Sequence, residues 1–174
     1  TGSISIAGAF ALTPYKYRRW GEDEMKNGFV KVAAATPDIR VADVEFNTQN
    51  IINAMEEAQK NGAKILVFPE LCVTGYTCSD LFDHSVLLKA SRKALLEIAE
   101  NTNDKDMLVF VGAPLEVNGK LYNVAAAMNQ GEIIGFTTKT FLPNYGEFYE
   151  MRQFTPGPQT VREITFEGKK IPFG

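Results

Sequence analysis

The strongest constraint on the fold is the order in which helical and strand-like hydrophobic patterns follow one another. Residues 29–35 (FVKVAAA) form a short apolar run that is typical of a buried strand. From 43 to 61 the hydrophobic side chains recur at helical spacing, and Asn61-Gly62 is a typical helix end. Residues 64–68 (KILVF) form a second apolar run, which Pro69 ends. This order predicts a β-α-β unit whose two strands lie parallel in one sheet.

The pattern changes in the middle of the chain from crossover units to hairpins. A second helical pattern covers residues 85–101, and a further buried strand is expected at 107–113. Asn118-Gly119 then separates two strand-like runs, which is the strongest short signal for a β-hairpin. Another turn at 129–131 leads into the strand EIIGFTT. We therefore predict an α+β (α/β) fold: a mixed sheet with helices on one face and a second layer on the other.

Composition and charge exclude several classes of function. The chain has 174 residues, 45% of them hydrophobic, and a net charge of −3, which suits one domain with a hydrophobic core. It has no long basic run and no apolar stretch of the ~20 residues that a membrane helix needs. We therefore expect neither nucleic acid nor a membrane as a partner. Cys72, Cys78 and the single histidine, His84, are too few soft ligands for a zinc site, so no metal is expected.

The first 24 residues differ in composition from the rest. A weakly apolar stretch is followed by a charged and aromatic one, and Met25 then precedes the first strand-like run. We expect residues 1–24 to be an extension, not necessarily native, and residues 25–174 to be the domain. A secretory signal would place basic residues before the apolar stretch, and none is found there. Together with two cysteines expected to be reduced, this predicts a cytoplasmic protein.

Two side chains stand where predicted strands end and are candidates for chemistry. Glu70 follows Pro69 at the carboxyl end of a predicted central strand, the edge at which open α/β sheets bind ligands. Lys139 closes the strand EIIGFTT. A carboxylate is suited to act as a general base, and an ammonium can stabilise an oxyanion. Either side chain could instead be a solvated loop residue, and the residues alone leave this open.

A long aromatic segment follows Lys139. Residues 142–158 form an irregular stretch, and a loop of this length in a compact domain is usually functional or disordered. Its aromatic residues favour an ordered loop. Glu147 and Glu150 lie within it, and one of them could pair with Lys139, or both could be solvated.

Cys72 is a tempting nucleophile because it lies two residues from Glu70. In an extended chain the two side chains would point to the same side. Local geometry would then lock the base against the thiol and leave no room for a substrate carbonyl. We therefore predict that Cys72 is a packing residue.

Two segments of the chain resemble a known family. FPELCVTGY, which contains Glu70, and KTFLPNYGEFYE, which begins at Lys139, are similar to motifs of the carbon–nitrogen hydrolase (nitrilase-like) superfamily. More narrowly, TGYTCSDLF and LPNYGEFYEMRQF resemble the glutaminase domain of the glutamine-dependent NAD synthetases. The resemblance covers residues 25–174. It implies a four-layer α-β-β-α sandwich that is incomplete at the C-terminus of this chain.

The resemblance also implies a Glu-Lys-Cys triad. Glu70 matches the general base, Lys139 matches the family lysine, and Glu147 matches a second glutamate that supports the lysine. The resemblance assigns substrate contacts or pocket walls to three aromatic residues: Tyr145, Tyr76 and Phe148. The family's cysteine is expected beyond Gly174, so the chain by itself is expected to lack catalysis.

The activity implied is hydrolysis of glutamine, with the ammonia passing to a downstream synthetase domain. That domain would use ATP and Mg²⁺ to amidate deamido-NAD, and no cofactor is expected in the present chain. A homo-oligomer is also expected from the resemblance. Two alternatives remain open: another amidase or carbamoylase of the same superfamily, and a non-catalytic binding module on the same fold.

Overall fold

The computed structural model describes residues 3–5, 10–11 and 28–174. Within the predicted extension, β1 (Ser3–Ser5) pairs antiparallel with β4 (Val32–Thr36), and β2 (Phe10–Ala11) pairs antiparallel with β3 (Phe29–Val30). The other residues of the predicted extension lie outside the described part. That residues 1–24 are an extension, not necessarily native, stays a prediction.

The main sheet is mixed, as the sequence predicts. Its eight strands follow the order β1-β4-β5-β6-β7-β8-β10-β9. β4 is parallel to β5 (Ile65–Val67), which is parallel to β6 (Leu108–Val117). β6, β7 (Lys120–Asn129) and β8 (Glu132–Thr138) then form an antiparallel meander. Crossover units and hairpins therefore contribute neighbouring strands to one sheet.

The strand predicted at 29–35 is divided in the structure. β3 belongs to the small sheet with β2, whereas β4 belongs to the large sheet. Lys31 lies at the division, and its carbonyl oxygen accepts a hydrogen bond of 2.8 Å from the backbone N–H of Lys64. The hydrophobic run predicts both strands. It does not indicate that the two strands pair with different partners, because strand pairing depends on the tertiary structure.

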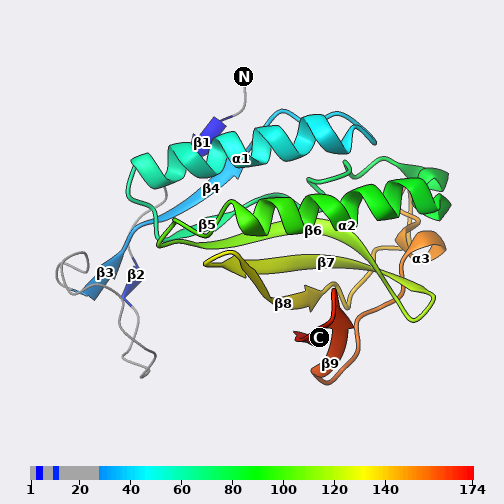
Figure 1. Ribbon diagram of the computed structural model, residues 1–174. Coiled ribbons are helices and arrows are strands. Elements are labelled where there is room, and N and C mark those ends of the chain that lie inside the picture. The colour runs from blue at the N-terminus through cyan, green and yellow to red at the C-terminus, as the bar shows by residue number, and fades with distance from the viewer. Residues whose placement is uncertain (1–2, 6–9, 12–27) are drawn as a thin grey trace.

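Two amphipathic helices cover one face of the sheet. Figure 1 shows α1 (Val44–Lys60) and α2 (Ser85–Glu100) side by side across this face. The Asp43 carboxylate caps α1 by accepting a hydrogen bond of 3.2 Å from the Phe46 N–H. Each helix turns its apolar stripe inward, which confirms the two predicted helices. We call this side of the sheet the helix face.

A C-terminal hairpin forms the edge of the main sheet beyond β8. β9 (Arg162–Phe166) and β10 (Lys169–Phe173) are antiparallel, and β10 also runs parallel to β8. The Phe166 ring lies 5.2 Å from that of Phe136, edge to face, and the guanidinium of Arg92 on α2 lies over Phe166. The hairpin therefore extends the sheet, and Phe166 faces the same side of the sheet as α2.

The opposite face of the sheet has no described helix over it. Ala34, Val67 and Phe110 lie in one row across β4, β5 and β6 on this face. The Val67 side chain is 45% exposed, whereas Leu66 beside it, on the helix face, is fully buried. We call this apolar surface the open face. One helical layer and one sheet are compatible with part of a nitrilase-type sandwich.

Candidate active site

Glu70 is positioned by a loop that crosses β6 at very close range. The chain turns at Pro69 after β5, and the Val73 N–H donates a hydrogen bond of 3.2 Å to the carbonyl of Gly112 on β6. A Cβ atom on Gly112 would lie 2.4 Å from the Pro69 carbonyl oxygen and 2.5 Å from the Leu71 nitrogen. Glycine at position 112 is therefore required for the loop to hold Glu70 where it does.

The residue after Glu70 has an unusual backbone conformation. Leu71 has a φ of +51° and a fully buried side chain. This left-handed conformation costs an L-residue about 1–2 kcal/mol. The Leu71 carbonyl accepts hydrogen bonds from the N–H groups of Thr74 (3.1 Å) and Gly75 (2.8 Å). Packing and these hydrogen bonds thus stabilise the strained turn that presents Glu70. Strained backbone of this kind is common at functional sites.

Lys139 approaches Glu70 from the end of β8. Its Nζ lies 2.7 Å from Oε1 of Glu70 and 2.9 Å from Oε1 of Glu150. Its backbone N–H donates to the Asn123 carbonyl (2.9 Å), and its carbonyl accepts from the Gly157 N–H (3.0 Å). The structure therefore brings together the two residues that the sequence singled out, although 69 positions separate them.

The second carboxylate at the lysine belongs to Glu150. This side chain is only 6% exposed, at the start of α3 (Glu150–Gln153), and Tyr76 donates a hydrogen bond of 2.7 Å to its Oε1. No described residue bonds to its buried Oε2. Glu147, which the resemblance assigns to supporting the lysine, is exposed and makes no ion pair with Lys139. Because the chain turns inward at α3, the contact falls to Glu150, and a catalytic role of Glu147 stays a prediction.

Asn123 is a residue of the site that the sequence analysis missed. Its side chain is 3% exposed on β7, and its Nδ2 donates a hydrogen bond to Oε1 of Glu70. The signal was present in the sequence as the one polar side chain within the strand-like run LYNVAAAM. A polar side chain buried inside an apolar strand needs a partner, and here the partner is Glu70.

Burial and hydrogen bonds at the site shift two pKa values. Burial lowers the pKa of Lys139, but its hydrogen bonds to Glu150 and Glu70 outweigh this and raise the pKa above the ordinary value of lysine. The pKa of the Tyr76 phenol is also raised, first by burial and then by the hydrogen bond to Glu150. Near neutral pH the lysine is therefore a cation and the tyrosine a neutral donor.

The three aromatic residues predicted to contact substrate lie in different settings. Tyr76 is 39% exposed and is tied to Glu150, close to the lysine. Tyr145 and Phe148 pack edge to face with ring centres 5.9 Å apart, and Tyr145 is 72% exposed. No hydrogen bond links the hydroxyl of Tyr145 to the described charged residues of the site. Their contacts with a substrate stay predictions.

Cys72 is buried and is poorly suited to act as a nucleophile. Its thiol lies 3.5 Å from the Gly112 carbonyl, as a donor in a packed interior. Burial raises the pKa of this thiol to about 12, so the reactive thiolate is not populated near neutral pH. Cys78 is also buried, and burial raises the pKa of its thiol. Both cysteines pack in the described core.

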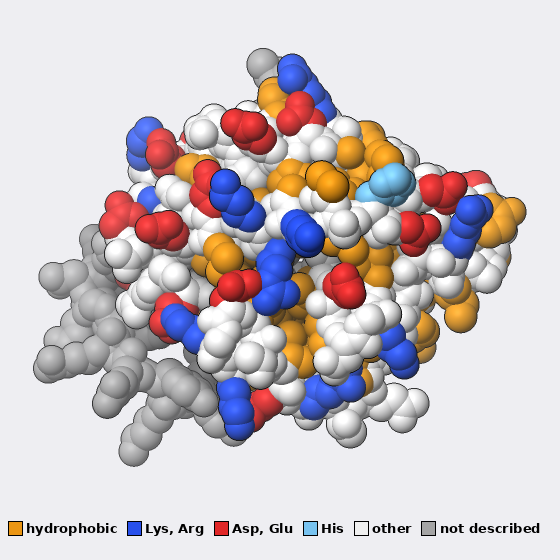
Figure 2. All heavy atoms as spheres, turned by 45° about the vertical axis from the view of Figure 1, so that its right-hand side comes forward, with side chains coloured by type: hydrophobic (Ala, Val, Ile, Leu, Met, Phe, Trp, Pro, Cys, Tyr) orange, Lys and Arg blue, Asp and Glu red, His pale blue; other side chains and the backbone are white. Residues whose placement is uncertain are grey.

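Neither a metal centre nor a membrane helix is found among the described residues. No group of three or more histidine, cysteine or acidic side chains could hold a metal ion within residues 28–174, and no described helix is long and apolar enough to cross a bilayer. Figure 2 shows acidic and basic side chains interspersed over the visible surface. The face seen in this view has no large patch of a single charge sign.

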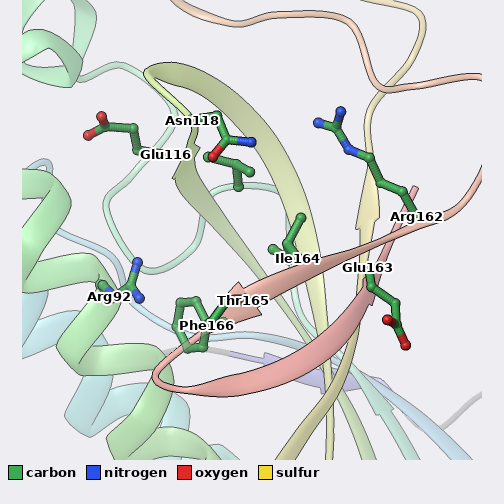
Figure 3. A pocket seen from close by; sticks show the side chains of 9 residues that line it. Arg92, Glu116, Asn118, Arg162, Glu163, Ile164, Thr165 and Phe166 are labelled. Carbon is green, nitrogen blue, oxygen red and sulfur yellow. The ribbon is translucent and has the colours of Figure 1, made fainter.

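A separate groove of about 450 Å³ lies away from the site (Figure 3). Its walls include Arg92 from α2 and Arg162 from β9. Arg92 is ion-paired with Glu167, and the Arg162 guanidinium lies 5.3 Å from the centre of the Phe173 ring. Arg92 therefore links α2 to the turn of the hairpin, whereas the Arg162 contact lies within the hairpin. Neither of the strand-end residues that mark the site lines this groove.

Comparison with known proteins identifies relatives for almost the whole described region. Residues 31–173 match the sequence profile of the carbon–nitrogen hydrolase family. The chain is 35% identical over 149 residues to the glutamine-dependent NAD(+) synthetase of Mycobacterium tuberculosis (strain H37Rv), covering 86% of the chain and 22% of that protein. It is 37% identical over 137 residues to the enzyme of the same name from Thermotoga maritima, covering 79% and 23%. The chain thus spans about a quarter of the length of these relatives.

Solved structures show the same relationship. The glutamine-dependent NAD(+) synthetase of Cytophaga hutchinsonii superposes with a TM-score of 0.79 at 35% identity, covering 83% of this chain and 25% of that one. An amidase from Nesterenkonia sp. superposes with a TM-score of 0.63 at 25% identity, covering 82% and 54%. The match covers a larger share of the amidase chain than of the synthetase chain. This agrees with one fold that the amidase and the synthetase have in common.

Proposed function

Since the chain belongs to the carbon–nitrogen hydrolase family, we propose that it forms part of a glutaminase domain in a longer glutamine-dependent NAD synthetase. In this proposal the domain hydrolyses the side-chain amide of glutamine. The ammonia then serves a synthetase domain that amidates deamido-NAD with ATP and Mg²⁺. The names and lengths of the similar proteins support it, because about three quarters of each relative lies outside the match.

The observation that carries the proposal is the contact between Glu70 and Lys139. One carboxylate oxygen of Glu70 receives the lysine ammonium, and no described side chain donates to the other oxygen. Glu70 can thus remain a base while a cation lies beside it. A carboxylate and an ammonium within 2.7 Å of each other suit an acyl transfer in which a proton is removed and an oxyanion develops.

The proposed reaction proceeds through a cysteine thioester. The thiol of the nucleophile gives its proton to Glu70 while its sulfur bonds to the amide carbon, and Lys139 stabilises the oxyanion. The amide C–N bond then breaks, and Glu70 returns the proton to the departing ammonia. Water, deprotonated by Glu70, then adds to the thioester carbon and the C–S bond breaks. Glutamate is released, and Glu70 returns the proton to the cysteine sulfur. The covalent intermediate replaces one difficult hydrolysis by two easier steps.

The geometry of β10 supports a nucleophile from the chain that follows it in a longer protein. The Gly174 carbonyl accepts a hydrogen bond of 3.0 Å from the Thr138 N–H, so β10 runs parallel to β8 up to the residue before Lys139. A chain that continued this strand would pass beside Lys139. Cys72, in contrast, is buried within the loop that carries Glu70. We propose in addition that the whole protein is cytoplasmic and homo-oligomeric.

Ammonia release from glutamine by the full-length protein tests the proposal. Glu70→Gln is expected to lower kcat by about a hundred- to ten-thousandfold, because it removes the general base. NAD formation from deamido-NAD and added ammonium chloride is the matched control and should persist in the variant. Hydrolysis of another amide in place of glutamine would support a different amidase, and no amide hydrolysis at all would support a binding module.

A further inference from the structure

We propose that Asn123 is a positioning residue for this reaction, which fixes the carboxylate of Glu70 by one oxygen and leaves the other to transfer the proton. This inference rests on the proposed function, since it assigns a step of that reaction. Two donors, Nδ2 of Asn123 and Nζ of Lys139, converge on Oε1 of Glu70. Among the described side chains none donates to Oε2.

Asn123 is built into the sheet rather than into a mobile loop. It lies on the interior of β7 opposite Pro114 of β6, and its side chain is 3% exposed. Tyr122 before it points to the helix face, where its ring meets Phe173 at 5.0 Å. Since side chains alternate along a strand, Asn123 projects from the other side of the sheet, where Glu70 lies. A buried strand position gives its amide little freedom.

The same residue also fixes Lys139. The backbone carbonyl of Asn123 accepts the hydrogen bond from the Lys139 N–H, and its side chain holds Glu70. One residue of β7 therefore sets the relative position of the base and the cation, which arrive from β5 and β8. Small errors in such a position have large effects on rate, of about a hundredfold for 1 Å.

An amide has the chemistry that this position requires. It donates a hydrogen bond without adding charge, so it orients Glu70 while Lys139 alone balances the carboxylate. When Glu70 takes up a proton on Oε2, its Oε1 can still accept the hydrogen bond from Asn123. The amide thus holds the base in both protonation states, as a residue that transfers a proton twice in one cycle requires.

The test uses the full-length protein and compares two variants at position 123. Asn123→Leu and the nearly isosteric Asn123→Asp both remove the Nδ2 donor, and each is expected to lower kcat for ammonia release by about a hundredfold. KM for glutamine should change by less than about threefold, because the substitutions do not remove a contact that binds substrate and transition state equally. The control is Asn129→Leu on the same strand, which removes a side-chain hydrogen bond to the Met107 carbonyl and should leave kcat unchanged.

A second comparison separates positioning from a general loss of structure. In the Glu70→Gln background, Asn123→Asp should cause little further loss, because Asn123 acts through Glu70. Equal losses in the two backgrounds would overturn the inference, as would a kcat within about threefold of wild type in both folded Asn123 variants. If wild type releases no ammonia from glutamine, the proposed function fails and this inference with it. An active wild type with unaffected Asn123 variants defeats the inference alone.

Discussion

At the scale of single residues, the site is a chain of hydrogen bonds that alternates between donors and carboxylates. Tyr76 donates to Glu150, Lys139 donates to Glu150 and Glu70, and Asn123 donates to Glu70. Each carboxylate therefore has one oxygen that receives two donors. An ammonium between two carboxylates remains protonated, which agrees with the raised pKa of Lys139.

The two glutamates of the loop give a prediction at this scale. Glu150→Gln removes the charge that is buried against Lys139, and we expect kcat for ammonia release in the full-length protein to fall about tenfold or more. Glu147→Gln removes an exposed carboxylate, and we expect a change of less than about threefold. Steady-state kinetics on both variants decides between the assignments. The reverse order of effects would favour the role that the resemblance gives to Glu147.

At the scale of elements, the site depends on a loop that lies directly on a strand. The segment after β5 touches the backbone of β6, and only the missing side chain of Gly112 makes room for it. The loop then returns to the sheet through hydrogen bonds at Gly112 and a left-handed turn at Leu71. The position of Glu70 is therefore a property of how two elements pack.

Gly112→Ala tests this packing. Its Cβ would meet the Pro69 carbonyl at 2.4 Å, so the loop must move, and we expect a loss of about 1–3 kcal/mol in the free energy of unfolding. Urea denaturation of the 174-residue chain measures the change. The matched control is Gly135→Ala on β8, where the nearest atom would lie at an ordinary 3.9 Å. Equal stabilities of the two variants would contradict the close approach.

At the scale of the whole molecule, the sheet is covered unequally on its two sides. The helix face is covered by α1 and α2, and the β9–β10 hairpin extends the sheet beyond β8 (Figure 1). The open face carries an apolar row in which Val67 is 45% exposed. Apolar surface of this kind on a sheet favours contact with another surface. The carboxylate, amide and ammonium of the candidate site lie toward this less covered side.

The open face gives a prediction about association. We expect the 174-residue chain by itself to self-associate as its concentration rises, and Val67→Lys to reduce the association, because the ammonium keeps the row hydrated. Sedimentation velocity measures the effect. Val86→Lys is the matched control, since Val86 is 79% exposed on α2 and lies away from the open face. Equal effects of both substitutions would show that the open face does not drive association.

The local elements were predictable because their signals are local. The helical stripe before Asn61-Gly62 became α1, and Asn118-Gly119 became the turn between β6 and β7. Glu70 and Lys139 could be singled out because each follows a buried strand. The division of the first predicted strand at Lys31 was missed, because the hydrophobic pattern of a strand does not indicate which strand it pairs with.

The sequence by itself determined the two long helices and the strands of the central meander, that the sheet is mixed, and which family the chain resembles. Only the tertiary structure decided which side chains meet at the site. Glu150 rather than Glu147 contacts Lys139, because α3 turns one carboxylate inward. Asn123 contacts Glu70 because β7 lies between the strands that precede Glu70 and Lys139. Periodicity records which way a side chain faces within its own element. The distance between elements depends on packing, to which the whole chain contributes.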